Sequence, residues 1–177
     1  MHAKLVRRHP HVFGDADART PGRVRERWEE LKTELEGREG VFHHVPETLP
    51  ALLEARKVQR RAAAVGFDWP DVAGPFAKIR EEIEELAAVM ERAGTPAPEA
   101  EPDPEVFHEL GDVLFALVNV ARRLNVDPEL ALRSTTRRFT SRVERAEELA
   151  AGDGMQWRAL DLDSQDGYYE RAKESPG

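Results

Sequence analysis

The sequence predicts an all-α protein built as an antiparallel helical bundle. Charged residues make up 34% of the 177 residues and aromatic residues 7%, a balance that suits amphipathic helices better than strands, which favour aromatic and β-branched side chains. Apolar residues recur at helical spacing in segments separated by proline and glycine, and no segment shows the sustained alternation of a half-buried strand. Several such segments joined by short connections favour a bundle.

Proline and glycine residues bound the first expected helices. We expect a helix over residues 21–36, with a threonine cap before it and a glycine after it, and then a loop. The next helix spans 49–65 and is followed by the aromatic turn Phe67-Asp68-Trp69-Pro70. A third helix, 75–92, is the most acidic segment, and the proline-rich loop after it cannot continue a helix.

The helix expected over 103–124 is the most apolar, with more than one apolar stripe, so we expect it to be central. Asp127 then caps a helix over 128–150, because aspartate is a favourable cap and proline suits the first helical position. A glycine-containing linker, 151–162, leads to a short closing helix over 164–173.

Length and charge limit the class of protein. A chain of 177 residues has room for one domain with an appendage, so we expect one core. The 26 basic and 34 acidic residues give a formal charge of −8, the wrong sign for a protein that binds duplex nucleic acid through its phosphates. No apolar run is long enough to span a membrane, and the start lacks the apolar block of a signal peptide, so we expect a cytoplasmic protein without a membrane partner.

The chain has no cysteine, which excludes disulfides, thiolate metal sites and a cysteine nucleophile. Any bound metal therefore needs oxygen or nitrogen ligands.

Two acidic pairs lie on neighbouring expected helices. Glu82 and Glu85 are three residues apart on one helix, and Glu109 and Asp112 are three apart on the next, so each pair projects from one face. The segment 86–108 between them is long enough to turn and return antiparallel, which would gather four carboxylates around one point. Such a group needs a cation, and an all-oxygen ligand set favours Mg²⁺ or Mn²⁺ over zinc.

These acids also fit two alternative roles. The glutamates within 81–85 alone could form a solvated helix face, although Glu109 and Asp112 argue against this because they interrupt the most apolar helix. A di-iron or di-manganese bundle needs a Glu-x-x-His pair on each of two helices. Glu105 and His108 form the one such pair in the sequence, so we expect His108 at the surface or behind the ligands.

Residues near the acidic pairs suggest a phosphate-bearing ligand. Asn119 lies seven residues beyond Asp112 on nearly the same face, and an amide among apolar residues needs a partner, either a ligand or a buried group. Lys78, four residues before Glu82, is either a cation beside the carboxylates or a simple i,i+4 ion pair. The two aromatic residues of 67–70 could stack on a base, although core anchoring accounts for at least one of them.

At this point the residues resemble a known family. Glu81-Glu82-Ile83-Glu84-Glu85 followed by Glu109-Leu110-Gly111-Asp112 looks like the EExxE…ExxD signature of MazG-type nucleoside triphosphate pyrophosphohydrolases, in the all-α NTP pyrophosphatase superfamily. Val65-Gly66-Phe67-Asp68-Trp69 and Val118-Asn119-Val120-Ala121-Arg122 are similar to that family's carboxy-terminal catalytic domain. The resemblance covers essentially all 177 residues.

The resemblance implies an enzyme that uses Mg²⁺, or Mn²⁺, to cleave the α–β phosphoanhydride of ribo- or deoxyribonucleoside triphosphates, releasing monophosphate and pyrophosphate as nucleotide-pool house-cleaning. It implies that Glu81 positions or deprotonates the attacking water. The implied magnesium ligands are Glu82, Glu85, Glu109 and Asp112. The residues it associates with the nucleotide are Lys78, Asn119, Arg122 and Trp69, with Lys57 and Arg60 as weaker candidates.

The resemblance also implies a tight homodimer in which two chains complete the bundle. It divides the chain into residues 1–48, a largely helical linker and stub of a preceding domain, and a catalytic domain, 49–177. Two alternatives stay open. One is a specialised dUTP or dCTP hydrolase or a phosphoribosyl-ATP pyrophosphohydrolase, and the other is a catalytically silent helical dimer that senses nucleotides or binds a protein partner. The complete set of four acids argues against the silent dimer.

Overall fold

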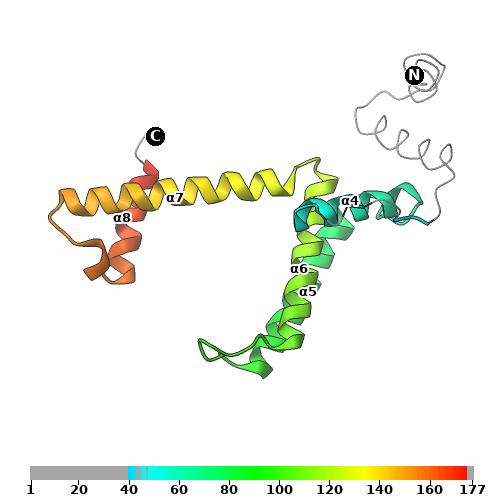
Figure 1. The fold of residues 1–177 in the computed structure, drawn as a ribbon, viewed down its shortest axis with the longest axis horizontal. Coiled ribbons are helices and arrows are strands. Elements are labelled where there is room, and N and C mark those ends of the chain that lie inside the picture. The colour runs from blue at the N-terminus through cyan, green and yellow to red at the C-terminus, as the bar shows by residue number, and fades with distance from the viewer. Residues whose placement is uncertain (1–39, 43–44, 47, 175–177) are drawn as a thin grey trace, which may run out of the picture. The chain divides into compact units, whose positions relative to one another are not determined.

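The computed structural model describes residues 40–42, 45–46 and 48–174, and the helix expected over 21–36 lies outside this part. All regular elements among the described residues are helices, which confirms the predicted all-α class (Figure 1). Contacts between residues divide the chain into two compact units, Met1–Asp127 and Pro128–Gly177. The length of the chain alone had favoured a single core. None of the described helices has the combination of length and apolar character that crossing a bilayer requires.

The first unit contains α4 (Ala51–Ala64), α5 (Ala73–Ala93) and α6 (Pro104–Arg123), whose bounds agree with the expected ones to within two residues. α6 packs against both α4 and α5, so the most apolar helix is central to this unit, as predicted. Helices α5 and α6 run antiparallel side by side (Figure 1). Ile79 of α5 packs with Ala116 and Val120 of α6 and forms the buried centre of this pair.

Local capping explains where the two site-bearing helices begin. The Asp103 carboxylate accepts hydrogen bonds from the backbone amides of Glu105 and Val106, and Pro104 occupies the first turn of α6. Before α5, Asp71 Oδ1 accepts from the Ala73 amide at 2.8 Å. Gly94 follows the last residue of α5, and its φ of 71° lies in the left-handed region that glycine adopts without strain. The start of each helix is therefore encoded by its neighbouring residues.

Polar contacts fix α4 against α6. The Gln59 side chain, 6% exposed, donates from Nε2 to the backbone carbonyl of Phe115 at 2.8 Å. Arg56 pairs with Asp127, just beyond α6, at 2.9 Å. These two contacts hold α4 against the carboxyl-terminal half of α6 and the residues just after it.

Several large apolar side chains of the first unit face solvent. On α6 they recur at helical spacing, namely Phe107, Leu110, Leu114 and Leu117, each between 47% and 66% exposed. On α5 they recur every seven residues, namely Phe76, Ile83 and Met90. Each helix therefore has one face packed within the unit and a second apolar face that nothing described in the chain covers.

The second unit contains α7 (Pro128–Gly152), a short 3-10 helix (Trp157–Ala159) and α8 (Leu162–Glu174). Small residues, Ala146, Ala150 and Ala172, are buried here, so the two long helices pack closely. An Arg171–Asp153 ion pair at 2.8 Å fixes α8 to the end of α7. The expected bounds of both helices are confirmed within two residues, and the 3-10 turn lies in the segment predicted as a linker.

Candidate active site

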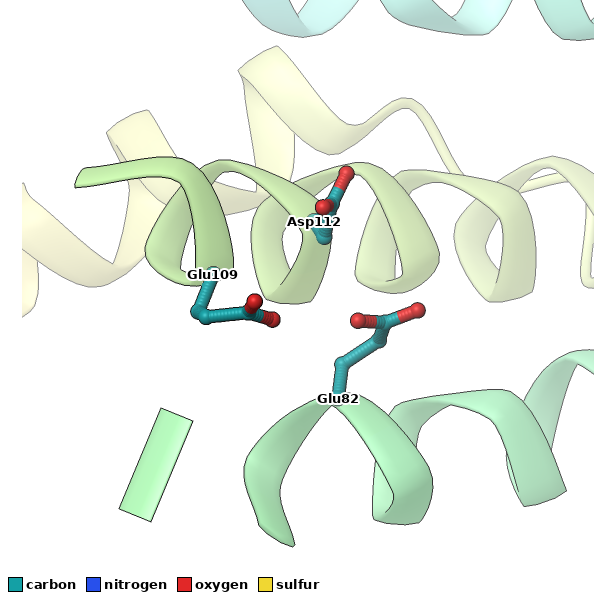
Figure 2. Close-up of side chains that lie close together, drawn as sticks. All are labelled: Glu82, Glu109 and Asp112. Carbon is teal, nitrogen blue, oxygen red and sulfur yellow. The ribbon is translucent and has the colours of Figure 1, made fainter. Parts of the chain in front are cut away.

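Three carboxylates from α5 and α6 lie close together (Figure 2). Glu82 comes from α5, while Glu109 and Asp112 come from successive turns of α6, and one oxygen of each lies within 4.8 Å of the other two. The antiparallel pairing of the helices and the three-residue spacing on α6 together place the acids here. Glu82 is buried, Glu109 is half-buried and Asp112 is exposed, so the group opens to solvent on one side.

The donor set fits a hard divalent cation. All three side chains offer carboxylate oxygens, the ligands that Mg²⁺ and Mn²⁺ prefer. Glu82 is only 5% exposed, and a buried carboxylate beside two further acids requires positive charge nearby. A metal at this point would supply it.

Glu85, the fourth predicted ligand, lies outside this group of three but within reach of its charges. It is exposed on the turn of α5 after Glu82. Partial desolvation, and then the negative charges of Glu82 and Glu109, raise the pKa of the Glu85 carboxyl. Its place as a metal ligand stays a prediction.

Lys78 and Glu81 form a second layer of charge beside the buried acid. Lys78 Nζ lies 2.5 Å from Glu82 Oε1 and 2.6 Å from Glu81 Oε1. Hydrogen bonds to Glu81 and then to Glu82 raise the pKa of Lys78 further above its already basic value, so this side chain is positively charged at any physiological pH. The spacing of four residues therefore does place a cation next to the carboxylates.

Asn119 and Arg122 belong to a polar cluster at the carboxyl-terminal end of α6. The Arg122 guanidinium donates to Asp68 Oδ2 at 3.0 Å and Oδ1 at 2.5 Å. It also donates from Nε and Nη2 to Asn119 Oδ1, at 3.0 and 2.7 Å. The Arg122 side chain is 8% exposed, so its charge is directed into the protein.

Asp68 is the member of this cluster that sequence reasoning missed. Burial opposes ionisation, but the hydrogen bonds and charges of Arg122 and Arg123 lower the pKa of Asp68 overall. Arg123 donates to Asp68 Oδ2 at 3.1 Å and to the Pro70 carbonyl at 3.0 Å, which ties the aromatic turn to α6. The sequence does contain a signal for this contact. The aromatic turn holds one acid, and two adjacent arginines stand at the end of the apolar helix α6.

Trp69 is anchored at the start of α5. A Cβ atom on Gly74 would overlap Trp69 Cδ1, so the indole packs directly on the glycine backbone, and 41% of the residue remains exposed. The weaker candidates are both on α4, where Lys57 is half-buried and Arg60 is exposed. The group of three carboxylates comes from α5 and α6, not from α4.

The alternative di-iron ligand set does not form among the described residues. His108 is exposed, with its ring edge-to-face on Phe107 at 5.8 Å between centroids, in agreement with the predicted surface position. Glu105 pairs with Arg92 at 2.9 Å. Neither residue joins the carboxylate group.

Comparison with known proteins identifies the segment that carries this group. Residues 75–147 match the family model of the MazG nucleotide pyrophosphohydrolase domain. Over 175 residues the chain is 41% identical to a nucleoside triphosphate pyrophosphohydrolase/pyrophosphatase MazG of Thermotoga maritima, covering 98% of this chain and 63% of the relative. Over 173 residues it is 36% identical to a nucleoside triphosphate pyrophosphohydrolase of Escherichia coli K12, covering 96% of this chain and 64% of the relative.

A third relative is an uncharacterized protein, YabN, of Bacillus subtilis, 38% identical over 174 residues, which are 97% of this chain and 34% of the relative. The chain spans less than two thirds of the length of all three relatives. All three carboxylates of the group lie within the matched residues 75–147. Residues 75–147 of this chain thus match the MazG nucleotide pyrophosphohydrolase domain.

Proposed function

We propose that this protein is a nucleoside triphosphate pyrophosphohydrolase, which cleaves the α–β phosphoanhydride of ribo- or deoxyribonucleoside triphosphates to the monophosphate and pyrophosphate. The observation that carries the proposal is the convergence of Glu82, Glu109 and Asp112 to within 4.8 Å inside the matched domain. Two relatives named for this activity align over nearly the whole chain.

The proposed metal ligands are Glu82, Glu109 and Asp112, with Glu85 at the edge of the group. When bound there, Mg²⁺, or Mn²⁺ in its place, supplies charge neutralisation for the phosphates and lowers the pKa of a coordinated water. The acids contribute a fixed array of oxygens on two packed helices, so little side-chain reorganisation is needed to bind the ion.

Lys78 and Glu81 are proposed to act on the substrate side of this group. A phosphate that approaches the carboxylates meets the Lys78 ammonium, which is 37% exposed and can leave Glu81 for a phosphate oxygen. The freed Glu81 carboxylate is 57% exposed and can then accept a proton from water. Further proposed nucleotide contacts are Asn119 and Trp69, and more weakly Lys57 and Arg60, while Arg122 is proposed to act at this site through its bonds to Asn119.

We further propose that two chains associate through the exposed apolar faces of α5 and α6. These faces lie on the helices that carry the carboxylates, and covering them removes large apolar side chains from water. A homodimer formed this way would complete a bundle around each site. Cytoplasmic house-cleaning of the nucleotide pool is the proposed setting.

A panel of nucleotides tests this function. The protein is incubated with Mg²⁺ and each of the eight common ribo- and deoxyribonucleoside triphosphates, with dUTP and phosphoribosyl-ATP added, and products are separated by chromatography. Monophosphate and pyrophosphate from several substrates support the proposal, while turnover of one alone would indicate a specialised hydrolase. No product from a folded dimer would overturn the proposed function.

A further inference from the structure

We propose that Asp68 and Arg122 are positioning residues that orient the Asn119 side-chain amide, so that its nitrogen donates a hydrogen bond to an acceptor atom of the nucleotide. This inference rests on the proposed function. It states that Asn119 is the donor in its proposed hydrogen bond with the nucleotide. In this arrangement Asp68 does not touch the substrate. It acts through Arg122, which holds Asn119.

The chemistry of arginine fixes the orientation of the amide. A guanidinium has donors and no acceptor, so the Asn119 atom that faces Arg122 must be the carbonyl oxygen. Two N–H groups of Arg122 do converge on Asn119 Oδ1, at 3.0 and 2.7 Å. The amide nitrogen, Nδ2, is therefore turned away from Arg122.

The Asn119 nitrogen is available to a ligand. Asn119 is 8% exposed, and no described residue accepts a hydrogen bond from its Nδ2 atom. Among the described residues, some side-chain atoms are fully buried and have no hydrogen-bond partner, for example Gln59 Oε1. Asn119 Nδ2 also has no partner among these residues but is not one of the fully buried atoms, so this nitrogen reaches the surface. The amide oxygen of Asn119 thus accepts two hydrogen bonds, while the amide nitrogen makes none with the described residues and can donate one to a ligand.

Asn119 lies on the side of α6 that carries the acids. It follows Asp112 by seven residues, two turns, so the two side chains share nearly the same face about 10 Å apart along the axis. Its neighbour Val120 packs with Ile79, next to Lys78 on α5. A nucleotide whose phosphates lie at the carboxylate group and Lys78 can therefore extend along α6 towards Asn119.

Asp68 holds the arginine that orients the amide. A long arginine side chain is mobile by itself, but the paired contacts to both Asp68 oxygens lock its plane. Both side chains are mostly buried, 8% exposed for Arg122 and 17% for Asp68, so solvent screens the pair weakly. Arg123, which also donates to the Pro70 carbonyl, adds a further hydrogen bond to Asp68 Oδ2.

The first experiment exchanges donor for acceptor with Asn119→Asp. Aspartate has the same size and pairs at least as well with Arg122, so the thermal midpoint should equal or exceed that of the wild type. Loss of the donor should raise KM for a nucleoside triphosphate about tenfold or more, with a much smaller change in kcat. Asn119→Leu, which adds no charge, should raise KM comparably, and a wild-type KM in both variants would overturn the inference.

The second experiment separates positioning from loop anchoring. Asp68→Asn removes the charge that holds Arg122 and should raise KM several-fold with little effect on kcat. Arg123→Gln is the matched control, because it removes the other partner of Asp68 and the bond to Pro70 but leaves the Arg122–Asn119 contacts intact. Its KM should stay within about twofold of wild type. An equal rise in KM in both variants would mean that Asp68 only anchors the turn, and would overturn its positioning role.

Calorimetric binding of an α,β-imido nucleoside triphosphate and of inorganic tripolyphosphate identifies the acceptor. Weaker binding of both ligands to the Asn119 variants places the acceptor on the phosphates, and weaker binding of the nucleotide alone places it on the base or sugar. A wild-type protein that binds the analogue but hydrolyses no nucleotide contradicts the proposed function. Equal binding of the analogue by wild type and Asn119→Asp contradicts only the donor role.

Discussion

Lys78 Nζ lies 2.5 Å from Oε1 of Glu82, the one buried acid of the three-carboxylate group. This ammonium is a counter-charge of Glu82, and a metal at the proposed site would share that carboxylate with it. The buried acid thus has a cation directly beside it, at the place where the substrate phosphates are proposed to bind.

Lys78→Met should weaken the metal-free protein and spare the metal-bound one. Removing the ammonium leaves Glu82 buried without its counter-charge, which should lower the free energy of unfolding by roughly 1–2 kcal/mol in EDTA. Added Mg²⁺ should restore most of this loss, because it is proposed to bind the same carboxylate. Urea unfolding in EDTA and in Mg²⁺ measures both values.

Lys173→Met is the control, since Lys173 makes an exposed i,i+3 pair with Glu170. Its effect should be below about 0.5 kcal/mol in either buffer. A Lys78 variant that resembles this control would contradict the counter-charge role.

The Asp68 ion pairs should make stability depend on acidic pH. Because Arg122 and Arg123 lower the pKa of Asp68 in the folded protein, its contribution is complete above the unfolded value of about 3.9. It is lost as pH falls through the lower folded value. The difference in unfolding free energy between wild type and Asp68→Asn should therefore be constant near neutral pH and shrink below about pH 4. A difference that grows on acidification would contradict this pairing.

Gly74→Ala should destabilise the protein although alanine is the better helix former. A Cβ atom would overlap Trp69 Cδ1 and lie 2.5 Å from Cγ, so the indole must move off α5. We expect a net loss of about 1–2 kcal/mol, because overpacking outweighs the gain in helix propensity. Gly167→Ala on α8, where a Cβ would meet nothing within 4 Å, should instead be neutral or stabilising. Thermal unfolding of both variants checks the contrast.

Leu114→Glu should dissociate the proposed homodimer. Leu114 is 47% exposed in the middle of the uncovered apolar face of α6, and a carboxylate there cannot be buried against a second chain without a large cost. Light scattering after size exclusion should give the mass of one chain, with helical content unchanged by circular dichroism. A wild-type protein that is already monomeric at micromolar concentration would contradict the proposed interface.

Local sequence predicted most of the helices and the acidic group. Helix bounds agree within two residues because caps such as Asp103 and helix-ending glycines such as Gly94 act on their neighbours. The three-residue spacing of Glu109 and Asp112 likewise depends on helix geometry alone. These features are encoded within a few residues of the chain.

Features that join distant segments were not predictable in the same way. Asp68 meets Arg122 across 54 residues, and no local spacing indicates that contact. The packing of Trp69 on Gly74 depends on the path of the turn between α4 and α5, which composition does not specify. The division of the contacts into two units after Asp127 likewise depends on packing between distant residues, which local spacing does not specify.

Glu82 provides the most direct test of the central claim, that three carboxylates hold the catalytic metal. In Glu82→Gln, Mg²⁺ should no longer raise the thermal midpoint, and nucleoside triphosphate hydrolysis should fall by at least about a hundredfold while the helical spectrum is kept. Glu84→Gln, an exposed neighbour outside the group, should retain both properties. Full Mg²⁺-dependent hydrolysis by Glu82→Gln would show that the metal is bound elsewhere.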